Sequence, residues 1–109
     1  MFKPIAIAAA LSALIVVPAV ASAYPGHPRI AQVNGRVFNQ NARIAQGYRA
    51  GQLTGVEARD LHREVRAINL QKRAAIASNG GFLTRQQQIN LNRQQNVVSR
   101  QIYAERRGA

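Results

Sequence analysis

The sequence predicts an all-α protein in which three amphipathic helices, joined by tight Gly-x-Leu-Thr turns, follow a cleaved signal peptide. Two observations carry this prediction. Apolar residues recur at helical spacing over three long segments, and a turn with helix-capping signals occurs twice at an offset of 30 residues. A chain of 109 residues has room for one small domain. We therefore expect either a small bundle or a helical cradle that dimerises.

The first 23 residues have the pattern of a secretory signal peptide. Lys3 supplies a positive charge, an apolar run follows and ends at Pro18, and the small residues at 21–23 form a cleavage site. The competing interpretation is a membrane anchor, but the run is only marginally long enough to span a bilayer and no stop-transfer charges follow it. We predict cleavage and a periplasmic or secreted protein, with a flexible lead-in over 24–29 and a helical domain over 30–109.

Two short segments repeat each other and define the turns between the helices. In each of them glycine supplies the left-handed residue that ends a helix. A threonine then caps the next helix together with a Glu or Gln three residues further on, which is a capping box. The repeat copies are 43–72 and 73–102. The structural residues of the first turn are Gly51, Leu53, Thr54 and Glu57, and those of the second are Gly81, Leu83, Thr84 and Gln87.

The helices themselves are expected over residues 30–49, 55–78 and 85–106. Each carries a narrow apolar stripe, nearer to a coiled-coil seam than to a wide globular face. Asn41 interrupts the first stripe, and Gln95 fills a gap in the third. The predicted core residues are Ile30, Val33, Val37, Ile44 and Tyr48 in the first helix, Ala58, Leu61, Val65, Ile68, Ala75 and Ile76 in the second, and Leu91, Val98 and Ile102 in the third.

Arginine dominates the charge of the chain. There are 15 Lys and Arg against 4 Asp and Glu, a formal net charge of +11. Arginines recur every seven residues in each helix, so each set shares a face; the second and third sets fall opposite the apolar stripes and the first flanks its own. Arginine binds carboxylate or phosphate in a bidentate way. The candidate binding residues are Arg36, Arg43, Arg59, Arg63, Arg66, Arg73, Arg93, Arg100 and Arg107.

Two interpretations of these arginine rows stay open. They form either a solvated surface that keeps a small amphipathic protein soluble, or a surface that binds a polyanion or an acidic protein. Leu70, Ile89 and Val97 are expected to lie off the apolar stripes. Apolar side chains between arginines suit the capture of unfolded polypeptide, and they suit a further helix contact or a homodimer equally well.

The sequence offers few residues for catalysis or metal binding, and we predict neither enzyme activity nor a cofactor. It has no cysteine, which excludes disulfides, thiolate catalysis and zinc–thiolate sites. His27 and His62 have no second ligand at helical spacing. The turns share glycine and leucine positions with the second half of an EF-hand loop but lack its carboxylates. A purely structural, degenerate EF-hand-like module is therefore an alternative, whereas calcium binding is not expected.

Leu83-Thr84-Arg85-Gln86-Gln87 is an L-T-x-x-Q motif, and Leu53-Thr54-Gly55-Val56-Glu57 is its Glu version. These segments resemble the LTxxQ motif of the Spy and CpxP group of periplasmic proteins, although the two motifs lie closer together here than in that group. The resemblance implies an exported, all-helical chaperone or envelope-stress accessory protein in which the motif residues are structural. The chain also resembles small exported proteobacterial proteins with repeated Gly-x-Leu-Thr-x-x-Glu turns.

Two function classes follow from these expectations. The first is a non-enzymatic periplasmic binding protein whose arginine faces hold acidic segments of client proteins and whose apolar patches hold exposed hydrophobic segments. The second is a polyanion-binding protein for lipopolysaccharide, anionic lipid or extracellular nucleic acid, whose affinity falls steeply with salt. Export argues against an intracellular nucleic acid as the partner.

Overall fold

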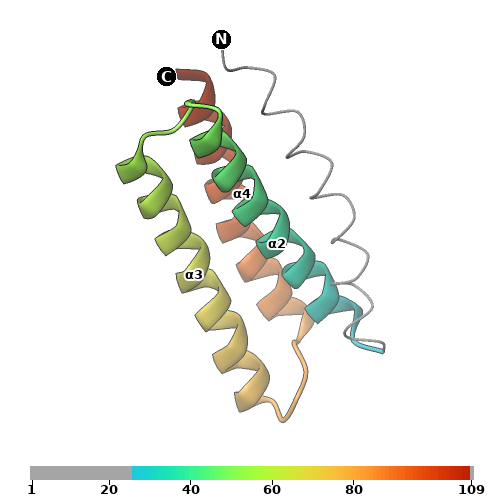
Figure 1. The fold of residues 1–109 in the computed structure, drawn as a ribbon. Coiled ribbons are helices and arrows are strands. Elements are labelled where there is room, and N and C mark those ends of the chain that lie inside the picture. Colours follow the sequence, from blue (N-terminus) through green and yellow to red (C-terminus); the bar gives the residue numbers. More distant parts are fainter. Residues whose placement is uncertain (1–25, 109) are drawn as a thin grey trace.

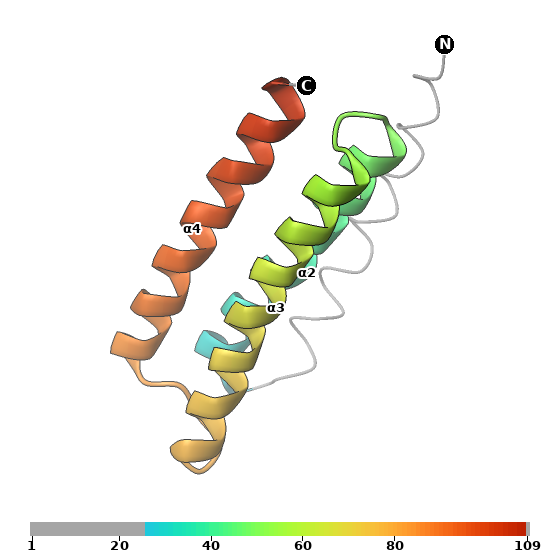
Figure 2. The same cartoon turned by 90° about the vertical axis from the view of Figure 1, so that its left-hand side faces the viewer.

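The computed structural model describes residues 26–108 as three helices in an up-down-up arrangement (Figure 1). Helix α2 covers Pro28–Arg49, α3 covers Gly55–Ser78 and α4 covers Arg85–Gly108. The α2–α3 turn and the C-terminal end of α4 lie at one end of the molecule, and the α3–α4 turn lies at the other (Figure 2). Each helix packs against both others, so the predicted all-α fold is confirmed as a small bundle.

Helix α2 begins two residues before its predicted start, and α4 ends two residues after its predicted end. The other helix bounds agree with the prediction. Helix α2 already begins at Pro28, because proline fixes a helical φ and its missing N–H is not needed in the first turn. Arg29, which was expected in the flexible lead-in, is therefore helical. The predicted signal peptide at 1–23 lies outside the residues that the structure describes.

Both predicted capping boxes are present. The Thr54 hydroxyl accepts from the N–H of Glu57 at 3.0 Å, and the Glu57 carboxylate accepts from the N–H of Thr54 at 2.9 Å. Thr84 and Gln87 repeat the arrangement with distances of 3.1 Å and 3.0 Å. Each pair satisfies backbone donors that the first turn of a helix leaves free. These hydrogen bonds fix where α3 and α4 begin.

Glycine and leucine have the expected roles on either side of these caps. Gly51 has φ +78° and Gly81 has φ +119°, a left-handed region that costs other residues energy. The leucines that precede the threonines, Leu53 and Leu83, are 3% and 2% exposed. Each turn therefore reverses the chain and also closes one end of the core with a leucine.

The core follows the predicted stripes. Residues 61–70 and 91–100 show the same order of buried, half-buried and exposed positions, so the 30-residue repeat in the sequence is also a repeat in packing. The buried apolar residues are Ile30, Val33, Ile44, Leu53, Ala58, Leu61, Val65, Ile68, Leu83, Leu91, Val98 and Ile102, against which Val37, Ala75 and Ile76 pack with partial exposure.

One predicted core residue is wrong. Tyr48 is 56% exposed, and the neighbouring Gly47 faces the interior in its place. A Cβ atom at Gly47 would lie 3.0 Å from the Leu53 side chain. Because the turn leucine fills this end of the bundle, no space remains for an aromatic ring.

Candidate functional site

The arginines of α2 lie in the interface between α2 and α4, which we call the α2–α4 seam. Arg36 donates to the side-chain oxygens of Asn92 and Asn96 at 3.1 Å and 2.7 Å. Arg43 donates to the hydroxyl and the backbone carbonyl of Ser99, both at 3.4 Å. Burial lowers the pKa of both arginines, and the charge of Arg106 lowers that of Arg43 further. These two candidate binding residues are thus half-buried and engaged in the contact between α2 and α4.

Two buried glutamines join the same helices at mid-height. The Gln40 amide donates to the backbone carbonyl of Gln95 at 2.7 Å and to the Ser99 hydroxyl at 2.8 Å. In return the Gln95 amide donates to the carbonyl of Val33 at 3.0 Å. Gln40 and Gln95 are 1% and 0% exposed. The sequence pattern placed Gln95 in the apolar stripe but missed Gln40, although Gln40 lies seven residues after Val33 and thus on the same helix face.

The other seven candidate arginines lie on α3 and α4 and are exposed, which agrees with their predicted place opposite the apolar stripes. Arg63 forms an exposed ion pair with Asp60 at 3.4 Å, the single salt bridge among residues 26–108. Arg107 donates to the Tyr103 hydroxyl at 2.6 Å and lies 5.2 Å from the centre of that ring. The exposed set is Arg59, Arg63, Arg66, Arg73, Arg93, Arg100 and Arg107.

The acidic residues gather where α3 meets α4, near the end formed by the α2–α3 turn. The chain has only four of them. Burial raises the pKa of Glu105, and the negative charges of Glu57, Glu64 and Asp60 raise it further. These carboxylates therefore repel one another across the two helices, and most of the exposed arginines have no acidic partner.

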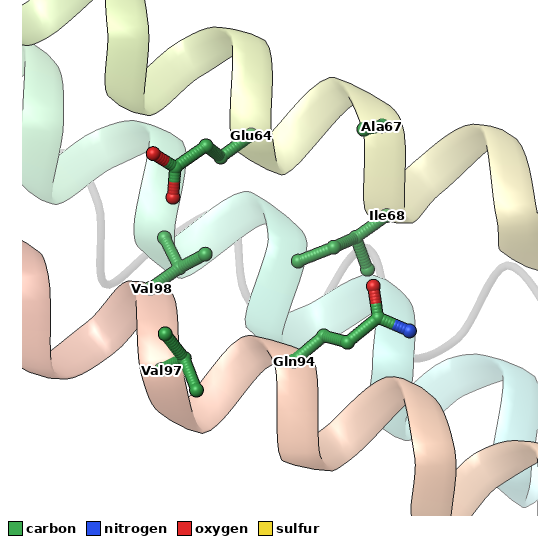
Figure 3. A pocket seen from close by; sticks show the side chains of 6 residues that line it. All are labelled: Glu64, Ala67, Ile68, Gln94, Val97 and Val98. Carbon is green, nitrogen blue, oxygen red and sulfur yellow. The ribbon is translucent and has the colours of Figure 1, made fainter.

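An open groove of about 300 Å³ runs between α3 and α4. Its floor is mainly hydrocarbon, and Figure 3 shows side chains from both helices around the same opening. Val97 is 46% exposed and Leu70, on α3, is 56% exposed; both were predicted to lie off the core stripe. Ile89, which was also predicted to lie off the core stripe, is half-buried. The residues that line this α3–α4 groove are Glu64, Ala67, Ile68, Gln94, Val97 and Val98.

A second and more polar cleft of about 400 Å³ lies between α2 and α3. His62, which was expected as a lone surface residue, is half-buried there, and its Nδ1 lies 2.9 Å from the side-chain oxygen of Asn41. Burial lowers the pKa of His62, and the charge of Arg66 lowers it further. The lining residues of this cleft are Val37, Asn41, His62, Val65, Arg66 and Asn69.

Lys72 is a buried cation that was not among the predicted core residues. Its ammonium donates to the side-chain oxygen of Asn34 on α2, and the residue is 6% exposed. Burial lowers the pKa of Lys72, and the neighbouring charge of Arg73 lowers it further. Lys72 lies seven residues after Val65, so helical periodicity alone would have placed it in the core.

The fold and its surfaces define a small basic three-helix bundle with an apolar groove on one side and a polar cleft on another. No group of His, Cys, Asp and Glu able to hold a metal ion is found within residues 26–108. In the same range, no helix is long and apolar enough to cross a membrane. Neither a protein-family model nor a curated protein nor a solved structure matches the chain.

Proposed function

We propose that the protein is a non-enzymatic periplasmic or secreted binding protein of the chaperone-like type, which holds segments of unfolded or acidic polypeptides on its α3–α4 face. The observation that carries this proposal is the apolar α3–α4 groove, which remains open to solvent. An open apolar surface on a small soluble domain is a common sign of an interaction site.

Exposed arginines flank this groove and supply the second half of the proposed recognition. Arg63 lies one helical turn before Ala67, and Arg93 and Arg100 lie one turn before and after Val97, so these arginines share the outer faces of the groove-lining residues. A client segment in which apolar and acidic side chains alternate would place its apolar side chains in the groove and its acidic side chains on the guanidinium groups. An envelope-stress accessory role is consistent with such transient binding.

The proposed role of the groove is tested by measuring how well the protein suppresses the aggregation of an unfolded client protein. We expect the wild-type protein to suppress aggregation at several-fold excess and Val97→Asp to lose most of that effect, because the variant places a charge on the groove floor. Val56→Asp is the matched control, since Val56 is an exposed valine outside the groove. No suppression by the wild-type protein, or equal loss in both variants, would contradict the proposal.

A second candidate function is the binding of an envelope polyanion such as lipopolysaccharide, anionic lipid or extracellular nucleic acid. It is favoured by the shortage of acidic partners for the exposed arginines. Pull-down from envelope extract at low and high salt separates the two functions, because phosphate contacts release counterions and weaken with salt. Client proteins held by apolar contacts should stay bound during the high-salt wash, whereas bound polyanions should be released.

A further inference from the structure

Helix α3 has two edges of opposite charge. Its acidic residues, Glu57, Asp60 and Glu64, lie on the side of α4, where their charges act on Glu105 and Glu64 lines the α3–α4 groove. The opposite edge carries three arginines, a histidine and an asparagine at intervals of three and four residues, which is one stripe of an α-helix. The residues of this edge are Arg59, His62, Arg66, Asn69 and Arg73.

Contacts with α2 show that this basic edge of α3 faces α2. His62 contacts Asn41, and Arg66 and Asn69 line the same cleft with Val37. His62 also lines a neighbouring cleft of about 300 Å³ together with Tyr48 and Arg49. The two clefts meet at His62 and together form what we call the α2–α3 groove. No acidic residue comes from α2, because all four in the chain belong to α3 and α4.

The spacing of the basic edge suits a long ligand better than a single ion. Arg59, Arg66 and Arg73 are seven residues apart, so the row extends over about 21 Å at 1.5 Å per residue. With His62 and Asn69 between them, a polar side chain occurs about every 5 Å along this edge of α3, and Arg66 at its centre lines the cleft itself. A chain of regularly spaced anionic groups can contact this whole row at once.

The polar groups of the groove suit phosphate. Arginine presents a planar fork of donors that matches phosphate oxygens in a bidentate way. The Nδ1 of His62 lies 2.9 Å from the side-chain oxygen of Asn41, so this contact with α2 holds the ring in place, and the phosphate contacts fall to the arginines. The row of arginines is uniform, which favours a polymer of identical phosphate groups.

We propose that the α2–α3 groove, together with the basic edge of α3 that borders it, binds a linear phosphate polymer, with Arg59, Arg66 and Arg73 each contacting a phosphate group. This inference rests on the second candidate function and assigns a site to it. The same chemistry is present in inorganic polyphosphate and in the backbone of a single-stranded nucleic acid. The exposed Tyr48 ring at one end of the groove distinguishes these two sources, because a nucleobase can stack on it and polyphosphate cannot.

The test measures the binding of medium-chain inorganic polyphosphate at a series of salt concentrations. The groove variant is Arg59→Gln/Arg66→Gln/Arg73→Gln, and the matched control is Arg93→Gln/Arg100→Gln/Arg107→Gln. Both remove three exposed arginines with seven-residue spacing, so both change the net charge equally.

We expect the groove variant to bind about tenfold more weakly or worse, and its plot of log affinity against log salt to flatten by about 2, since each phosphate contact contributes about 0.7. The control should lose less than about threefold, an effect of net charge alone. Equal weakening in both variants overturns the site and leaves the polyanion function standing. No binding of polyphosphate by the wild-type protein at low salt overturns both.

Two further measurements complete the test. In the first, a single-stranded oligothymidylate is titrated beside polyphosphate. If the oligothymidylate binds more tightly and Tyr48→Ala abolishes that difference, the ligand is a nucleic acid. If Tyr48→Ala leaves binding unchanged, the ligand is the phosphate chain.

The second measurement applies if the groove variant does not fold. Asn69→Asp then places a carboxylate at the centre of the groove. It should weaken binding more than Asn90→Asp on α4, and equal effects would overturn the site.

Discussion

The two interfaces of α4 differ in the kind of polar contact that crosses them. In the α2–α4 seam, amides and guanidinium groups reach across to backbone carbonyls and side chains of the other helix. Between α3 and α4, by contrast, Gln71 and Gln94 exchange hydrogen bonds at 2.8 Å and 2.9 Å. Beside that pair lie an open apolar groove and a set of repelling carboxylates. The seam has an apolar hollow of its own, of about 320 Å³ beside Gly35, Arg36 and Ser99. The two interfaces therefore differ in the hydrogen bonds that cross them, which are structural in the seam, and in the carboxylates that only the second contains.

This difference shows that residues of the same type and spacing acquire different roles from their position relative to the core. Arg36 and Arg43 flank the apolar stripe of α2 and are half-buried, whereas Arg93 and Arg100 lie opposite the stripe of α4 and are exposed. Hydrogen bonds from a charged donor that is partly shielded from water contribute to stability. Exposed cations contribute little to it and remain available for a ligand.

The largest expected effect comes from Gln95, one of the two buried glutamines of the seam. Gln95→Ala should lower the free energy of unfolding by about 3 kcal/mol, because it leaves a cavity and removes the hydrogen bond to the Val33 carbonyl. Gln94→Ala is the matched control on the neighbouring position, and it should cost less than about 1 kcal/mol since its partner Gln71 is exposed to water. Urea denaturation measures both. Similar costs would show that the two interfaces are not different in kind.

A smaller effect is expected from the arginines. Arg36→Ala/Arg43→Ala should lower the free energy of unfolding by about 2 kcal/mol, from the loss of hydrogen bonds to Asn92, Asn96 and Ser99. The control Arg93→Ala/Arg100→Ala should stay within about 0.5 kcal/mol of the wild-type protein. Both are read from the same urea titrations. A control variant as unstable as the seam variant would contradict the assigned roles.

The smallest effect is expected from Glu105, the one carboxylate that belongs to α4. The folded state raises the pKa of Glu105 above its ordinary value of 4.5, so the folded protein holds that proton more tightly than the unfolded chain. Stability from this group is therefore present at low pH and is lost as pH rises from 4.5 through the folded pKa. Glu105→Gln should be more stable than the wild-type protein at neutral pH, and the two should converge below pH 4.5. Thermal unfolding across this pH range tests it, and a less stable variant at neutral pH would refute it.

Much of the fold could be predicted because its signals are local. The capping boxes, the left-handed glycines and the apolar stripes act within a few residues of one another, and they set the bounds of α3 correctly. The burial of Gln95 also followed from periodicity. The same periodicity places Gln40 and Lys72 on the core faces of their helices, but their polar side chains kept them out of the predicted core. The exposure of Tyr48 could not be predicted in this way, because it depends on the turn leucine that packs beside Gly47.

The candidate site was less predictable for the same reason. Seven-residue spacing groups the arginines into rows, but it does not tell which helix will lie beside each row. The division of α3 into an acidic edge toward α4 and a basic edge toward α2 follows from the order in which the three helices pack. His62 became part of a cleft only because Asn41 lies opposite it.

An odd number of helices also has an electrical consequence. Since α2 and α4 run parallel (Figure 1), two helix C-termini share one end of the bundle with a single N-terminus, and their peptide dipoles cannot cancel. At that end Arg49, Arg106 and Arg107 in the last turns offset the negative carbonyl ends. At the other end, the first turns of α2 and α4 contain no acidic residue. The positive dipole ends of α2 and α4 are therefore not offset by acidic side chains in their own first turns, whereas the negative ends are offset by arginines.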